Sequence, residues 1–304
     1  MLRSLLYYPL YGFLYVLSLL PLRLLYILSD AARFVLFRIF GYRKAVVFEN
    51  LRASFPEKSI EELNRIADKF FINFTDNFIE TLKLLSADEN FIRSHFVIEN
   101  PEVYEQFFKA GKRCQVHLGH VFNWEMASVA VPFYTDYPFL IVYMPLKNPL
   151  FDRLLRKLRT RTGTVLLPAT DMRKSMLPYR HMRYMIALVA DQAPGNPANA
   201  YWLNFFGRPT PIIRGPERGA RVGNIPTVFA EISKAKRGYY RARIEMGAEK
   251  PAELPEGELT RRYVDFLQKS IARNPSMWLW SHRRWKHGWK EEYQKLWIGG
   301  ELKG

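Results

Sequence analysis

His120 and Glu125 are the two residues of this sequence whose types and spacing best fit acid–base chemistry. An apolar run over 114–118 predicts a short buried strand, Gly119 predicts a turn, and a helical pattern begins directly afterwards. His120 is therefore expected where a strand meets a helix. This is a frequent position for catalytic side chains in α/β folds.

A carboxylate at position 125 can reach back to one ring nitrogen of His120 and fix the tautomer of the imidazole. The other ring nitrogen is then free to act as a base. No nucleophilic hydroxyl accompanies the pair, so the nucleophile is expected to be the hydroxyl of a substrate. The pattern predicts acyl transfer to an alcohol, although a His and a Glu five residues apart also occur by chance in many proteins.

His117 is the alternative base. It lies inside the predicted strand, three residues before His120, and Phe122 stands at the position equivalent to Glu125. Because it lacks a carboxylate at that spacing, His120 is the preferred candidate.

The segment His-Leu-Gly-His-Val-Phe-Asn-Trp-Glu, which ends at Glu125, resembles the active-site block of the late (lauroyl/myristoyl) acyltransferases of lipid A biosynthesis. These enzymes fall within a wider group of glycerolipid acyltransferases that carry His, four residues, then Asp or Glu. Other segments resemble the same family in the same order, over roughly residues 5–290. They are 143–152 followed by Arg159, 190–192, 205–209 and 278–286.

The resemblance implies an acyltransferase of lipopolysaccharide biosynthesis that uses His120 and Glu125. Such an enzyme moves a fatty acyl chain from an acyl carrier protein or coenzyme A thioester to a hydroxyl of a lipid A precursor. No cofactor is implied. The expected substrate-binding residues are Arg159, Asp191, Gln192, Asn123, Lys147, Arg283 and Arg284.

Two of these residues also have a physical argument. The guanidinium of Arg159 suits a phosphate or carboxylate of a substrate. Asp191 ends an apolar strand, where ligands bind in open α/β sheets, and it is expected to pair with Arg159 or with a neighbouring base. The remaining basic residues of that helix, Arg153, Arg156 and Lys157, are expected to form a solvated charged face.

The composition fits one large α/β domain of 304 residues with 48% apolar residues, and the formal net charge is +16. Such a charge suits nucleic acid, an anionic membrane surface or an acidic partner such as an acyl carrier protein. Nucleic acid is disfavoured because no nucleic-acid-binding motif is present. Neither metal-ligand spacing nor a phosphate-binding glycine loop occurs, and the single cysteine, Cys114, allows no disulfide within the chain.

Residues 5–28 are almost wholly apolar, and a basic amphipathic stretch follows up to residue 40. This pattern predicts a membrane anchor or interfacial helices over 1–42, followed by an acyltransferase domain over 43–304. Basic residues beyond the apolar run favour the cytoplasmic side of the inner membrane for the domain. The alternative is a helix buried in the core.

The rest of the chain predicts an α/β fold with a mixed, largely parallel sheet flanked by helices, as in glycerolipid acyltransferases. A capping box at Ser59 and Glu62 begins a long helix with an apolar stripe to Leu85. The predicted strands are 96–99, 113–118, 138–144, 164–167, 185–190, 226–230 and 239–245. The predicted helices are 101–109, 122–131, 148–160, 170–181, 215–223 and 258–273.

Three alternatives remain at this stage. The acceptor could be another membrane lipid, such as a lysophospholipid or an aminolipid. The chain could instead be a non-catalytic, membrane-tethered binding protein of the same fold. A weaker third alternative is nucleic-acid binding through the tryptophan-rich basic segment that includes 278–286, which could instead be a packing element, an interfacial element or a contact for anionic groups.

Overall fold

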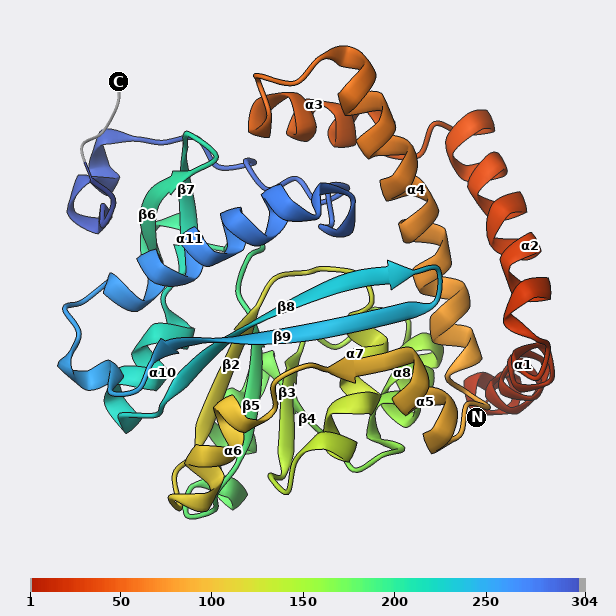
Figure 1. Cartoon of the computed structure of the whole chain (residues 1–304), viewed down its shortest axis with the longest axis horizontal. Helices are drawn as coiled ribbons and strands as arrows, with labels where there is room; N and C mark the ends of the chain where they lie inside the picture. Colours follow the sequence, from red (N-terminus) through yellow and green to blue (C-terminus); the bar gives the residue numbers. More distant parts are fainter. Residues whose placement is uncertain (1, 301–304) are drawn as a thin grey trace.

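A seven-stranded sheet forms the centre of the computed structural model, which describes residues 2–300 (Figure 1). The strand order is β1-β9-β8-β2-β5-β3-β4, and all neighbouring pairs are parallel except the hairpin β8–β9. The strands are β1 (Phe96–Ile98), β2 (Cys114–Leu118), β3 (Phe139–Tyr143), β4 (Val165–Pro168), β5 (Met185–Val189), β8 (Thr227–Lys236) and β9 (Tyr239–Ala248).

All seven strands predicted from apolar runs belong to this sheet, and a mixed, mostly parallel sheet flanked by helices is confirmed. Five of the six predicted helices are also present: α6 (Glu102–Lys109), α7 (Trp124–Ala130), α8 (Pro149–Thr160), α10 (Gly215–Gly223) and α11 (Glu258–Arg273). The predicted helix 170–181 is wrong in extent. Only the single turn α9 (Met172–Ser175) is α-helical, because Pro178 cannot continue the hydrogen-bond ladder.

A second sheet, which the sequence patterns did not predict, consists of the antiparallel pair β6 (Ala200–Phe205) and β7 (Arg208–Ile213). Two prolines, Pro209 and Pro211, lie in β7 and argue against a strand, although an edge strand tolerates them. Phe206 and Gly207 form the turn between the strands, with φ values of 50° and 72°.

The N-terminal part is helical: α1 (Leu2–Ser18), α2 (Leu22–Arg33), a π-helical turn (Phe34–Ile39), α3 (Lys44–Ser54), α4 (Ile60–Lys83) and α5 (Glu89–His95). The predicted capping box at Ser59 and Glu62 begins α4. In Figure 1, α2 packs along α4 at the end of the molecule opposite β6 and β7.

No single helix among residues 2–300 is long and apolar enough to cross a membrane. Two segments pass that test only as a pair, Leu6–Ser18 and Leu22–Ile39, and they are bent by 115° where they meet. Many apolar side chains of this pair are exposed, among them Phe13 and Ile27. The structure supports the membrane anchor only weakly, and the anchor stays a prediction.

A buried carboxylate of α4, that of Glu80, binds the N-terminal helices to the sheet. Glu80 accepts hydrogen bonds from the Tyr26 hydroxyl (2.8 Å), the Tyr240 hydroxyl (2.6 Å) and the amide of Asn123 (2.9 Å). Burial raises the pKa of Glu80, although the nearby charge of Lys234 lowers it. One polar cluster therefore joins α2, α4 and β9 to the start of α7.

Candidate functional site

Parallel pairing of β2 with β5 brings His120 and Asp191 together. Leu118 at the end of β2 is in register with Val189 at the end of β5, and each candidate residue follows two positions later. The carboxyl ends of neighbouring parallel strands meet at one edge of a sheet, where open α/β folds bind their ligands. Two residues that are 71 positions apart in the chain thus become neighbours.

Asp191 holds His120 through two hydrogen bonds. Nδ1 of the imidazole lies 2.5 Å from Oδ1 of Asp191, and the backbone amide of His120 donates to Oδ2 at 2.7 Å. The indole of Trp278 donates to the same Oδ2 at 2.6 Å. Burial raises the pKa of Asp191, but the charge and hydrogen bonds of His120 and the Trp278 indole outweigh it and lower the pKa.

The expected contact between Glu125 and His120 is wrong, because Asp191 occupies Nδ1 of the imidazole. Helix α7 begins only at Trp124, with Asn123 as its N-cap, so His120 lies in a bend before the helix and helical spacing does not apply. The carboxylate of Glu125 instead accepts from Nε (2.7 Å) and Nη2 (2.5 Å) of Arg159, and from the Trp124 indole at 3.0 Å.

A glycine permits the close approach of Asp191 to the strand end. A Cβ atom at Gly119 would lie 3.1 Å from Oδ2 of Asp191 and 2.6 Å from Cδ1 of Leu267. The C-terminal segment holds the other side of the loop, since Leu279 donates to the carbonyl of His120 at 3.0 Å and Phe122 donates to the carbonyl of Met277 at 3.0 Å. The loop that carries His120 is thus fixed by backbone contacts as well as by Asp191.

The second ring nitrogen of His120, Nε2, makes no hydrogen bond within residues 2–300. The side chain is 24% exposed, whereas that of Asp191 is 1% exposed. The ring of Trp124 packs edge-on against the imidazole, with the centroids 5.8 Å apart. Such an arrangement is suited to general-base chemistry, since one nitrogen is fixed by a buried carboxylate and the other makes no hydrogen bond within residues 2–300.

The other expected substrate-binding residues lie in different environments. Asn123 is fully buried, and both ends of its amide are engaged, with the Met126 amide (3.0 Å) and with Glu80. Lys147 is exposed in the loop between β3 and α8, and Gln192 is half-buried directly after Asp191. These positions leave the roles of Lys147 and Gln192 as predictions.

The tryptophan-rich segment is largely a packing element. Trp278, Trp280 and Arg284 are fully buried, whereas Arg283 is exposed. Arg284 donates through Nη2 to the carbonyl of Pro211 at 2.9 Å, and burial lowers its pKa to about 10. As the structure stands, only Arg283 of the two arginines is accessible to a substrate.

His117 lies within the sheet, 2% exposed, with Nε2 2.9 Å from the side-chain amide of Gln115. Burial lowers its pKa to about 3. Such a histidine is neutral in the folded protein over the whole range in which an unfolded histidine titrates, and it has no access to a substrate.

Acid should therefore destabilise the protein through His117. The unfolded chain binds a proton at this residue below about pH 6.5, whereas the folded chain does so only near pH 3. The stabilising contribution is complete above pH 6.5 and is lost as the pH falls, by about 1.4 kcal/mol per unit. His117→Asn should remove this part of the slope in urea unfolding measured from pH 6.5 to 4.5. Equal slopes for the two proteins would contradict the assignment.

Removal of one partner from the ion pair of Glu125 with Arg159 should be costly, since the two side chains are only 6% and 17% exposed. Glu125→Gln or Arg159→Gln is expected to lower the free energy of unfolding by about 3 kcal/mol, because the remaining charge is left buried without a partner. The double variant should lose less than the sum, with a coupling of roughly 1–3 kcal/mol.

Asp265→Asn provides the matched control for that measurement. It forms an ion pair with Lys269 through a single contact, and both side chains are more than 60% exposed. The control should change the free energy of unfolding by less than about 1 kcal/mol. Additive single effects at Glu125 and Arg159 would show that the pair does not act as a unit.

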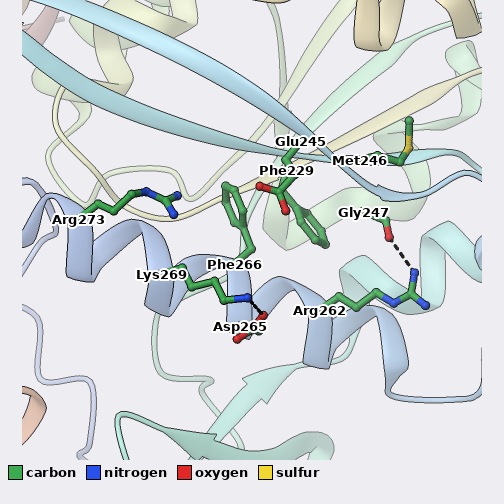
Figure 2. A pocket seen from close by; sticks show the side chains of 9 residues that line it. All are labelled: Phe229, Glu245, Met246, Gly247, Arg262, Asp265, Phe266, Lys269 and Arg273. Atoms are coloured by element: carbon green, nitrogen blue, oxygen red, sulfur yellow. Dashed lines mark hydrogen bonds and ion pairs between the residues drawn. The ribbon is translucent and has the colours of Figure 1, made fainter.

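A cavity of about 190 Å³ lies apart from this site, between β9 and α11 (Figure 2). Its basic side chains already have partners: Lys269 pairs with Asp265, Arg262 donates to the carbonyl of Gly247, and Arg273 pairs with Glu231. None of the predicted site residues lines it, so the cavity does not contribute to the chemistry of His120.

The residues 2–300 contain no group of three or more His, Cys, Asp or Glu side chains that could hold a metal ion. His120 has one acidic partner, and the other nearby acid, Glu125, is neutralised by Arg159. The arrangement of these side chains supports proton transfer by the imidazole.

Residues 1–287 match the family model described as bacterial lipid A biosynthesis acyltransferase. The match covers most of the chain, and the chain belongs to this family. It is therefore an acyltransferase of lipid A biosynthesis, with an acyl donor and a lipid acceptor as its substrates. A search of curated proteins found no match.

Proposed function

We propose that this protein transfers a fatty acyl chain from a thioester donor to a hydroxyl of a lipid A precursor, with His120 as the general base. The observation that carries the proposal is the imidazole geometry: Nδ1 is bound to buried Asp191, and Nε2 has no partner within residues 2–300. Family membership supplies the class of reaction and of acceptor.

In the proposed reaction, Nε2 of His120 removes the proton of the acceptor hydroxyl as the oxygen attacks the thioester carbonyl. The tetrahedral intermediate collapses with cleavage of the carbon–sulfur bond, and the imidazolium returns the proton to the departing thiolate. An acyl-enzyme is not needed, because the thioester is already activated. Asp191 stabilises the imidazolium that forms between the two proton transfers.

Glu125 has a different role in this proposal from the one that its spacing indicated. It fixes Arg159 through two hydrogen bonds and keeps the guanidinium charged, which is consistent with the raised pKa of Arg159. The remaining nitrogen, Nη1, donates no hydrogen bond within residues 2–300. It is available to an anionic group of a substrate, which is the role that the resemblance implies for this arginine.

For the donor we propose an acyl carrier protein, with coenzyme A as the alternative. The net charge of +16 supports a strongly acidic protein partner, since complementary charge accelerates association. We further propose that the enzyme lies at the cytoplasmic face of the inner membrane. The exposed apolar residues of α1 and α2 and the basic residues after them support this location.

The test is an acylation assay with purified full-length protein. The acceptors are a phosphorylated, acylated disaccharide precursor, a lysophospholipid and an aminolipid, each offered with acyl carrier protein or coenzyme A thioesters. We expect one added acyl chain on the disaccharide, detected by mass spectrometry, and a faster reaction with the carrier protein that slows as salt is raised. Acylation of the lysophospholipid or aminolipid in place of the disaccharide would overturn the proposal.

A further inference from the structure

A groove of about 570 Å³ lies between α1 and α8, outside the site described above. It is lined by Tyr7, Tyr8, Arg153, Arg156, Lys157 and Thr160. The four residues from α8 follow the spacing i, i+3, i+4 and i+7, which places them on one face of the helix. The sequence indicated a solvated charged face here, and Arg153, Arg156 and Lys157 are indeed exposed; α1 packs beside this face.

The cations of the groove contact aromatic rings. The guanidinium carbon of Arg153 lies 3.9 Å from the ring centre of Tyr7, and the ammonium of Lys157 lies 3.9 Å from that of Tyr11. Neither these two nor Arg156 forms an ion pair with a carboxylate within residues 2–300, unlike the cations of the cavity in Figure 2. A ring orders a cation without neutralising it. Apart from Nη2 of Arg153, which donates to the Tyr8 hydroxyl at 3.5 Å, the N–H donors of these three side chains make no hydrogen bond within residues 2–300 and stay available to an anion.

Helix α1, the other wall of the groove, carries an exposed apolar surface. Tyr8 is 65% exposed and Phe13 is 66% exposed, and Leu6 and Val16 are also largely exposed. Such a surface beside a row of cations is typical of helices that lie at the boundary between acyl chains and lipid headgroups. The cations of α8 therefore lie where the headgroups of a bilayer would be.

We propose that this groove binds the phosphate of an anionic bilayer phospholipid, whose acyl chains lie against the exposed face of α1. Arginine matches phosphate with its forked donors, and a nearby lysine adds a point charge. The apolar surface favours a lipid over an acidic protein such as the acyl carrier protein, because a soluble acidic partner would leave the side chains of α1 exposed. The lipid bound here need not be the acceptor, so the inference is independent of the proposed reaction.

The test measures binding of the full chain to vesicles by flotation. We compare phosphatidylcholine vesicles with vesicles that also contain phosphatidylglycerol. The triple variant Arg153→Gln, Arg156→Gln, Lys157→Gln should lower partitioning onto the phosphatidylglycerol vesicles about 100-fold, from the attraction that three cations contribute near an anionic surface. It should have little effect on phosphatidylcholine vesicles.

The matched control is Arg173→Gln, Lys174→Gln, Arg218→Gln, which removes the same charge from exposed positions without ion pairs in the described part of the chain. It should lower partitioning less than about 10-fold. Thermal unfolding of each variant verifies that it is folded. If the two triple variants lose partitioning equally, the groove is not a binding site, and overall charge alone explains the attraction to the vesicles.

Two further arms test the chemistry of the ligand. Vesicles that carry oleate at the same surface charge should bind less tightly and should discriminate less between the two triple variants. A planar carboxylate presents only two oxygens in one plane, whereas a tetrahedral phosphodiester presents two free and two ester oxygens that several cations can approach at once. Equal behaviour on oleate would overturn the assignment of phosphate. If the groove variant binds vesicles normally but binds an acidic acyl carrier protein more weakly, the lipid proposal is wrong and the groove is a protein-docking surface.

Discussion

Replacement of His120 by alanine is expected to lower kcat for acyl transfer about 10²–10⁴-fold, which is the usual contribution of a positioned general base. The reason is the loss of Nε2, which has no hydrogen-bond partner within residues 2–300 and lies on a ring that is 24% exposed. KM should change little, since the imidazole acts mainly in the transition state. Initial rates with labelled donor and purified precursor measure both constants.

His117→Asn is the control for this measurement. It alters a histidine of the neighbouring strand that is buried against Gln115 and has no access to a substrate. Its kcat should stay within about twofold of the unmodified protein, whereas its stability profile changes as described above. A large fall in kcat for His117→Asn, together with full activity of His120→Ala, would assign the base to His117 and refute the mechanism.

Asp191→Asn is expected to lower kcat by a similar or larger factor, although Asp191 itself does not touch the substrate in the proposed reaction. In hydrolases with a Ser-His-Asp triad, the same change at the acid lowers kcat about 10⁴-fold, because the neutral amide no longer fixes the productive tautomer. Here the side-chain oxygen of asparagine can still accept from Trp278 and from the His120 amide. The fold should therefore be retained, and the defect should appear in kcat with KM nearly unchanged.

Glu217→Gln separates this positioning role from a merely structural one. Glu217 is also a fully buried carboxylate, but it binds the amides of Gly257 and Thr260 at the start of α11. Its replacement should lower stability without a comparable loss in kcat. If Asp191→Asn and Glu217→Gln have the same effect on kcat at equal loss of stability, Asp191 is only a packing residue.

The sequence patterns predicted the sheet well because each strand depends on local features. Apolar runs bounded by turn residues identified all seven strands of the main sheet, and the capping box located the start of α4. The hairpin β6–β7 was not predicted, because two prolines in β7 locally disfavour a strand. Its antiparallel pairing with β6 stabilises the strand in spite of them. Alternation of strands and helices was enough to predict a largely parallel sheet.

The position of His120 directly after a predicted strand and turn was enough to predict it as a candidate base. The position of Asp191 at the carboxyl end of β5 was enough to predict it as a candidate site residue. Their contact was left open, since the sequence equally allowed Asp191 to pair with Arg159. The feature that could have favoured it is Gly119, whose missing side chain leaves room for Asp191. The hydrogen bond from Asn123 to Glu80 was not predicted. The only sequence feature that pointed to it is a carboxylate within the apolar pattern of α4.

The sequence by itself determined which elements form and which residue types stand at their ends, because strands, caps and turns depend on neighbours within a few positions. Only the tertiary structure decided which acid serves which partner. Pairing of β2 with β5 places Asp191 beside His120, and packing of α7 on α8 places Glu125 within hydrogen-bond distance of Arg159. Such choices depend on strand order and helix packing, which residues 71 and 34 positions apart do not encode in their local spacing.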